Sequence, residues 1–154
     1  MINPWNPHAV VEHEIAGLLR AEDWFKKYRV TIVEENHGDF ATLLKKNLAQ
    51  IGGVVLVVAV DEITNEYPAA VVNITITAIE GVPVNRAHND FATAMDVAQA
   101  AIEVIDGEWW HWDNVEHDSP AEGVLQATAH FRGMVKRETT PDPTQHDTRI
   151  KGDD

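Results

Sequence analysis

Cysteine is absent from the 154 residues of the sequence, which excludes disulfide scaffolds, thiolate metal sites and cysteine nucleophiles. Serine occurs once, at Ser119 before Pro120, and no nucleophile elbow surrounds it. No apolar run reaches the roughly 18 residues of a membrane-spanning helix. Residues 1–5 lack the basic and then apolar segments of a signal peptide, so we expect a protein made in the cytoplasm without membrane contact.

Basic residues are also scarce, with 12 Lys and Arg against 25 Asp and Glu and a formal net charge of −13. Nucleic acids and anionic membranes are bound through Lys and Arg, so neither is an expected partner. The one basic cluster, residues 26–29, stands where a helix is expected to end, which suits the helix dipole. Hydrophobic residues make up 44% of the chain, enough for the core of one domain.

Apolar residues at helical spacing predict two main helices. The first extends from about residue 8 to 27, and the second follows an N-cap at Asn89 or Asp90 and ends at Gly107. The spacing also predicts a short helix over 40–51 that stops at two glycines, with a strand extension as the alternative.

β-branched and alternating segments predict strands over 29–33, 54–60, 69–79, 109–116 and 124–136. In the third segment Val72, Ile74, Ile76 and Ala78 are expected to form the buried face. The second and third segments are separated by about eight residues, so we expect an antiparallel pair.

The predicted order is helix, strand, short helix, strand, strand, helix, strand, strand. It indicates an α+β domain over residues 1–137, in which two main helices pack on a mainly antiparallel sheet. Residues 138–154 contain two prolines, many charges and one aliphatic residue, and we expect a disordered acidic and polar tail.

The best candidate metal ligands are His111, Asp113 and His117, which project from one face of a regular strand. The two histidines are then six steps apart, about 20 Å, too far for one ion unless the chain turns. A solvated strand face is the preferred interpretation, so we predict no metal, no cofactor and no catalytic residue. A metal-dependent enzyme built on these three residues remains a lesser alternative.

Other candidates give weaker signals. His8 and His13 lie about 140° apart around a helix, and the glycines at 52 and 53 precede a strand, whereas phosphate loops follow one. His130 is expected to meet an acid across a strand, in a structural pair. Neighbouring carboxylates of the kind that any acidic surface offers occur at Glu12 with Glu14 and at Asp61 with Glu62.

Tryptophan is unusually concentrated in one predicted strand, at Trp109, Trp110 and Trp112. At least one of the three should enter the core. The others, together with Trp5 in the proline-flanked N-terminal segment, are predicted to form a protein interface, where tryptophan is enriched.

The segment from about residue 69 to 136 resembles the core of the tail terminator, or tail completion, proteins of long-tailed bacteriophages. In that family a strand such as Val72–Ile76 leads through a loop to a long Ala-rich helix, and two further strands follow. An initial amphipathic helix, here residues 8–27, precedes the strands. The acidic balance, the extra short helix and the tryptophan-rich strand depart from the family pattern.

The resemblance implies a subunit of the virion tail or neck that closes into a ring, commonly a hexamer, on the finished tail tube. The ring would stop tube growth and bind the head connector. The alternative is a small acidic cytoplasmic module that binds and neutralises a basic protein.

Overall fold

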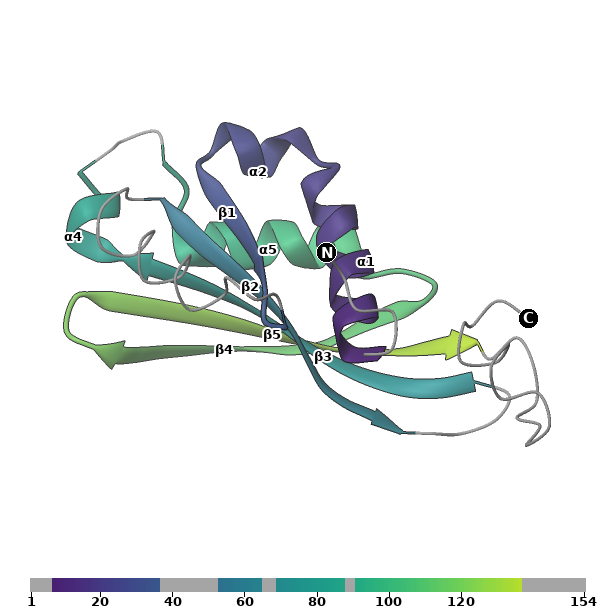
Figure 1. Ribbon diagram of the computed structural model, residues 1–154. Helices are drawn as coiled ribbons and strands as arrows, with labels where there is room; N and C mark the ends of the chain where they lie inside the picture. The colour runs from purple at the N-terminus through teal and green to yellow at the C-terminus, as the bar shows by residue number, and fades with distance from the viewer. Residues whose placement is uncertain (1–6, 37–52, 65–68, 88–90, 137–154) are drawn as a thin grey trace.

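The computed structural model describes residues 7–36, 53–64, 69–87 and 91–136. They form a single α+β domain, which confirms the predicted fold class (Figure 1). The helices are α1 (Pro7–Arg20), α2 (Asp23–Lys27), α4 (Val82–Asn85) and α5 (Ala94–Ile105). The strands are β1 (Val30–Glu34), β2 (Val54–Thr64), β3 (Ala69–Gly81), β4 (Trp110–Ala121) and β5 (Val124–Lys136).

All five strands belong to one sheet, in the order β1-β2-β3-β5-β4. The predicted antiparallel pair is confirmed: β2 and β3 pair antiparallel, with Val57 opposite Thr77. β5 pairs antiparallel with both β3 and β4. Only β1 differs, because it runs parallel to β2. The sheet is therefore mixed, with one parallel pair at one edge.

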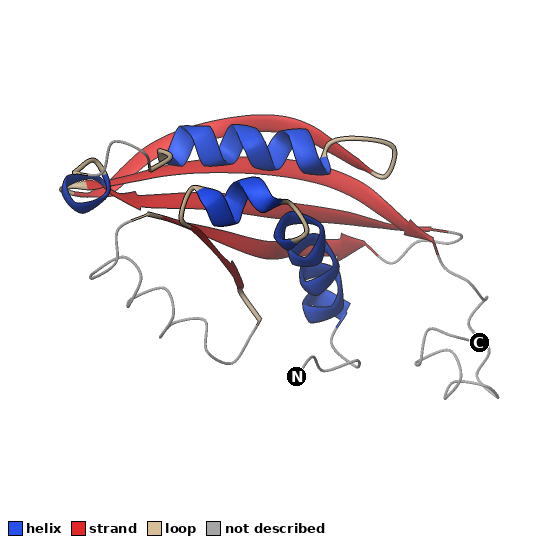
Figure 2. Ribbon diagram, turned by 90° about the horizontal axis from the view of Figure 1, so that it is seen from above, coloured by secondary structure: helices blue, strands red, loops and turns tan. Residues whose placement is uncertain are grey.

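The helices lie against one face of the sheet, and the core fills the space between them (Figure 2). The predicted alternation of β3 is confirmed, since its four expected core residues are fully buried. Burying a side chain of this size contributes about 2 kcal/mol, so the alternation determines which face of β3 meets the helices. These strand residues pack with Ile15 and Leu19 of α1, Val97 and Ala101 of α5, and Phe131 of β5.

The first predicted helix is two helices, not one. α1 ends at Arg20, and Glu22 takes an extended conformation before α2 begins. After this break Phe25 of α2 enters the core, with 1% of its surface exposed. Leu18 of α1, which the predicted apolar stripe included, is 48% exposed. The helical spacing predicted one continuous apolar stripe because the spacing of apolar residues does not show where the helix axis changes direction.

The second main helix begins later than predicted, and part of the preceding loop is helical. α4 lies between the end of the predicted strand over 69–79 and the expected start of this helix, and the N-cap of α5 is Thr93 rather than Asn89 or Asp90. Thr93 and Asp96 bind each other's backbone N–H groups in a capping box. This reciprocal arrangement satisfies two exposed donors of the first turn and outcompetes the earlier candidates.

β4 extends past its predicted end. The predicted strand ended at residue 116, but β4 continues to Ala121, and the turn to β5 falls at Glu122 and Gly123. Gly123 adopts a φ of +78°, a conformation that suits glycine. Proline is tolerated in β4 because this strand lies at the edge of the sheet, where a missing N–H breaks no ladder.

Three predictions concern residues outside the described ranges and stay predictions. They are Trp5, the short helix over 40–51 and the tail over 138–154. Within the described ranges, no helix is long and apolar enough to cross a membrane.

Candidate interaction surface

Trp110 is the tryptophan of β4 that joins the core. Its side chain is half-buried and packs against the main apolar cluster. It pairs with Gly133 of β5, and a Cβ added to that glycine would lie 2.2 Å from Cε3 of the indole. The tryptophan can therefore lie across β5 only because its partner has no side chain.

Trp109 and Trp112 are the exposed tryptophans, with 57% and 45% of their surfaces accessible. The side chain of Trp109 stands between two hollows of about 500 and 470 Å³. Met134, which is 55% exposed, lines both hollows, and Leu18 of α1 lines the larger one. We call Leu18, Trp109 and Met134 the tryptophan patch.

A second apolar patch lies at the other end of β5. Leu125 and Val84 are 39% and 42% exposed, near the β4–β5 turn and in α4 respectively. The Val82 N–H donates to the carbonyl of Gly123 at 2.8 Å, which holds α4 beside this turn. Leu125 and Met134 are nine residues apart on β5, about 30 Å along an extended strand. The two apolar patches therefore lie at opposite ends of the sheet.

The candidate metal ligands of β4 do not share a face. A bulge at Asp113 shifts the register, so that His111 pairs with Arg132 whereas His117 pairs with Ala127. Ala127 is buried on the helix-covered face, and Arg132 is exposed on the other face. The prediction that the two histidines project together was wrong because the bulge adds one residue. No group of three His, Asp or Glu residues within the described ranges is arranged to hold a metal ion.

β4 and its flanks are strongly acidic. Six Asp or Glu residues occur between positions 106 and 122, with no Lys or Arg among them. Every residue of the strand from 116 to 121 is exposed. This edge of the sheet therefore carries several negative charges on side chains that solvent reaches.

The expected pairing of His130 is confirmed. Its Nε2 lies 3.1 Å from Oε2 of Glu116 on the neighbouring strand, an ion-pair distance without hydrogen-bond alignment. The neighbouring carboxylates, which were not expected to form a site, have different surroundings. Glu12 is buried while Glu14 is exposed, and Asp61 accepts a hydrogen bond from the hydroxyl of Thr75.

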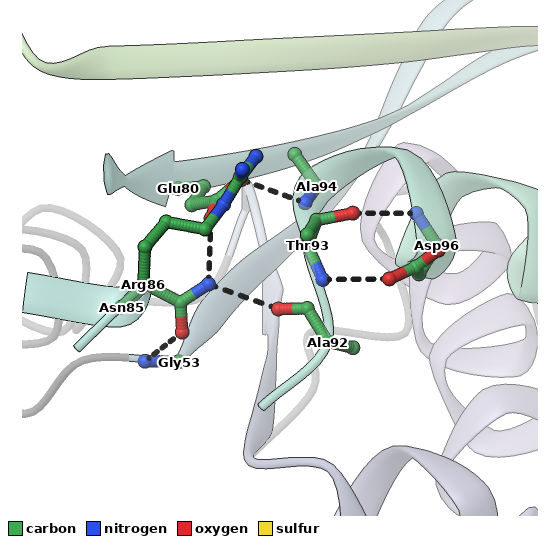
Figure 3. A network of polar contacts seen from close by, with 8 residues as sticks. All are labelled: Gly53, Glu80, Asn85, Arg86, Ala92, Thr93, Ala94 and Asp96. Atoms are coloured by element: carbon green, nitrogen blue, oxygen red, sulfur yellow. Dashed lines mark hydrogen bonds and ion pairs between the residues drawn. The ribbon is translucent and has the colours of Figure 1, made fainter. Parts of the chain in front are cut away.

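Glu80, which sequence reasoning did not single out, is a fully buried carboxylate at the end of β3 (Figure 3). Arg86 donates to it from Nε at 2.5 Å and from Nη2 at 3.2 Å. Asn85 Nδ2 donates at 2.7 Å, and the N–H of Ala94 donates at 3.0 Å. Burial raises the pKa of Glu80, but these hydrogen bonds outweigh it and hold the pKa below its ordinary value of 4.5.

Asn85 extends this network to β2. Its Oδ1 accepts the N–H of Gly53 at 2.8 Å, and its Nδ2 also donates to the carbonyl of Ala92. The two buried side chains, Glu80 and Asn85, thus connect the start of β2, the end of β3 and the start of α5 (Figure 3). The alternation of β3 could have indicated that Glu80 is buried, because Glu80 continues the series of residues that form the buried face of this strand.

A second polar network attaches α1 to the edge of the sheet. Glu34 of β1 accepts hydrogen bonds from Arg20 at 2.7 Å and from His13 at 3.2 Å. Arg20 also donates to the carbonyl of Ile32 on β1. Burial raises the pKa of Glu34, but Arg20 and His13 hold it below 4.5. His8 and His13 were not expected to form a site, and His13 contacts this carboxylate.

Glu12, the residue before His13 in α1, also connects this helix to the sheet. Its Oε2 accepts the N–H of Val60 at 3.0 Å, where β2 has continued beyond the end of β1. Its carboxylate also accepts the backbone and side-chain N–H groups of Asn36. A buried carboxylate is tolerated here because it satisfies donors that the sheet leaves unpaired.

Comparison with solved structures finds this fold in a chain of the virion of a native gene transfer agent (GTA) particle. The two chains superpose with a TM-score of 0.51 and 14% sequence identity, over 79% of this chain and 91% of that chain. At this sequence identity, the comparison shows that the two chains share a fold. The sequence matches no protein-family model and no curated protein.

Proposed function

We propose that the protein is a structural component of a bacteriophage or phage-like particle, and that it acts without catalysis. In this proposal it is a tail terminator: copies form a ring, such as a hexamer, on the end of the tail tube and connect it to the head. The protein is made in the host cytoplasm and ends in the tail or neck of the virion. The supporting observation is the fold shared with a GTA virion chain over most of both chains.

The two apolar patches support assembly into a ring. Isologous pairing would join each patch to its own copy, whereas a heterologous contact joins different patches and generates rings or filaments. The tryptophan patch and the patch around Leu125 are at opposite ends of β5, so one subunit can present one patch to each neighbour. The net charge of −13 opposes association of free subunits until these contacts form.

Tube capping tests the proposal directly. The purified protein is mixed with a polymerising tail tube protein, and tube lengths are measured by electron microscopy. We expect shorter tubes with a ring at one end. Trp109→Ser should abolish capping, while Met95→Ser, which alters another exposed apolar residue, on α5, should not. Tubes that grow unchanged at saturating protein would contradict the proposal.

The second candidate function, an acidic module that binds a basic protein, is favoured by a hollow between α2 and α5. This hollow of about 650 Å³ is lined by Glu22, Asp96 and Glu103 around the rings of Trp24 and Phe25, without Lys or Arg. Such a module should capture one basic protein at low salt and release it at high salt, because screening weakens exposed charge pairs. A protein with this second function should leave the growth of tail tubes unaffected.

A further inference from the structure

β4 is an edge strand of 12 residues with β5 as its strand neighbour. Among the described residues, no strand lies on its other side. A long edge of this kind presents unpaired backbone groups that a further strand can bind. Natural edges are commonly protected by lysines, prolines, bulges or cover. β4 has a bulge at Asp113 and a proline at Pro120, but the segment between them contains neither, β4 has no lysine, and its side chains are almost all exposed.

At the start of β4 the outward backbone groups already have hydrogen-bond partners, whereas in its middle they are open to a further strand. The carbonyl of Trp110 accepts the N–H of Gly107, and the N–H of Trp112 donates to Oδ1 of Asp106. These groups therefore point away from β5. Backbone direction alternates along an antiparallel strand, and the bulge at 113 adds one residue. The N–H and carbonyl groups of Val115 and His117 consequently face outward.

A second copy of the chain fits this open edge poorly. Two β4 edges would bring Glu116 and Asp118 against the acids of the other copy, and like charges across a ladder are destabilising. The β1 edge of the sheet offers a second copy fewer open backbone groups, since Arg20 of α1 already binds the carbonyl of Ile32 there. The strand that completes β4 should therefore come from a different protein.

We propose that the β4 edge binds an extended segment of a partner protein in which basic and apolar residues alternate. Glu116 and Asp118 pair with Thr128 and Gln126 and so lie on the face without helices, where they would meet the basic residues. Val115 lies on the helix-covered face and packs against the core, so the apolar residues of the segment would extend this cluster. The inference stands independently of the proposed ring, which uses other surfaces.

The probe is a synthetic peptide of about nine residues, long enough to span the open part of β4, with alternating lysine and valine. Hydrogen exchange of the full-length protein is followed by NMR with and without the peptide. We expect slower exchange at the amides of Val115 and His117, and a peptide with glutamate in place of lysine should leave both unchanged. Unchanged exchange with the lysine peptide, or equal protection by the two peptides, would overturn the proposal.

Two variants separate backbone pairing from general charge attraction. Glu116→Lys with Asp118→Lys should weaken peptide binding about tenfold or more, because two favourable cross-strand charge pairs become unfavourable. Glu103→Lys with Glu22→Lys changes the charge equally at a distant surface and should preserve most of the binding. His117→Pro removes one outward N–H and should also weaken binding, with the fold checked by circular dichroism. If the distant pair weakens binding as much as the β4 pair, the segment binds by net charge alone and the proposal is wrong.

Discussion

The indole of Trp110 occupies the space that a side chain on Gly133 would need. The two residues face each other across the β4–β5 ladder, and the contact fixes the tryptophan against the core. Its neighbour Trp109 is held at the surface between the two hollows. One glycine on β5 thereby helps to determine which tryptophan is structural and which is available for contact.

Gly133→Ala should destabilise the protein by about 2 kcal/mol, because the added methyl group overlaps the indole and forces local rearrangement. Chemical denaturation gives the free energy of unfolding. Gly17→Ala is the control: no atom lies within 4 Å of the added Cβ, and alanine favours the interior of α1, so the free energy should rise slightly. Equal stability of the wild type and Gly133→Ala would contradict the described packing.

Glu80→Ala should reduce the free energy of unfolding by about 3 kcal/mol, since buried N–H donors of Asn85 and Ala94 lose their acceptor. Glu103→Ala, on the exposed face of α5, should change it by less than about 0.5 kcal/mol. Thermal and denaturant unfolding of the two variants provide the comparison. If Glu80→Ala leaves the free energy of unfolding unchanged and only speeds amide hydrogen exchange at the start of α5, the network stabilises only the start of that helix.

Stability should fall as the pH decreases below about 4.5. Glu80 and Glu34 have folded pKa values below 4.5, so their contribution is complete above that pH and is lost as the pH falls toward the folded values. Melting temperature measured as a function of pH should therefore decline through this acidic range. Glu80→Gln should flatten the decline, and an unchanged slope in this variant would assign the acid sensitivity to other groups.

Glu35 should behave in the opposite sense. Partial desolvation of its carboxylate, together with the charges of Glu12 and Asp61, raises its pKa above 4.5, so its ionised form is disfavoured in the folded protein. Its ionisation lowers stability as the pH rises through the raised value. Glu35→Gln should therefore increase the melting temperature at neutral pH and leave it nearly unchanged at pH values below its ordinary pKa.

The proposed heterologous contact predicts complementation between two defective variants. Trp109→Glu and Leu125→Glu should each abolish ring formation while leaving the free energy of unfolding within about 0.5 kcal/mol, because both side chains are exposed. Mixed in equal amounts, the two variants should form a heterodimer, since one intact patch of each kind remains. Light scattering and native mass spectrometry would detect it. Absence of the heterodimer, with the wild type assembling normally, would exclude contact between these two patches.

The sequence by itself determined the main elements and the buried face of β3. Val72 and Ile74 belong to an alternating pattern that only a strand with one covered face explains, and the Ala-rich stripe of α5 is likewise a local signal. These properties depend on residues close together in the chain. They can be read without knowing which other segment packs against them.

Only the tertiary structure decided the placement of the site residues. The bulge at Asp113 separated His111 from His117, and the missing side chain of Gly133 allowed Trp110 into the core while Trp109 stayed outside. The role of Glu80 likewise depends on donors supplied by other segments. Register, bulges and partner atoms arise from pairing between distant parts of the chain, which periodicity along one segment does not encode.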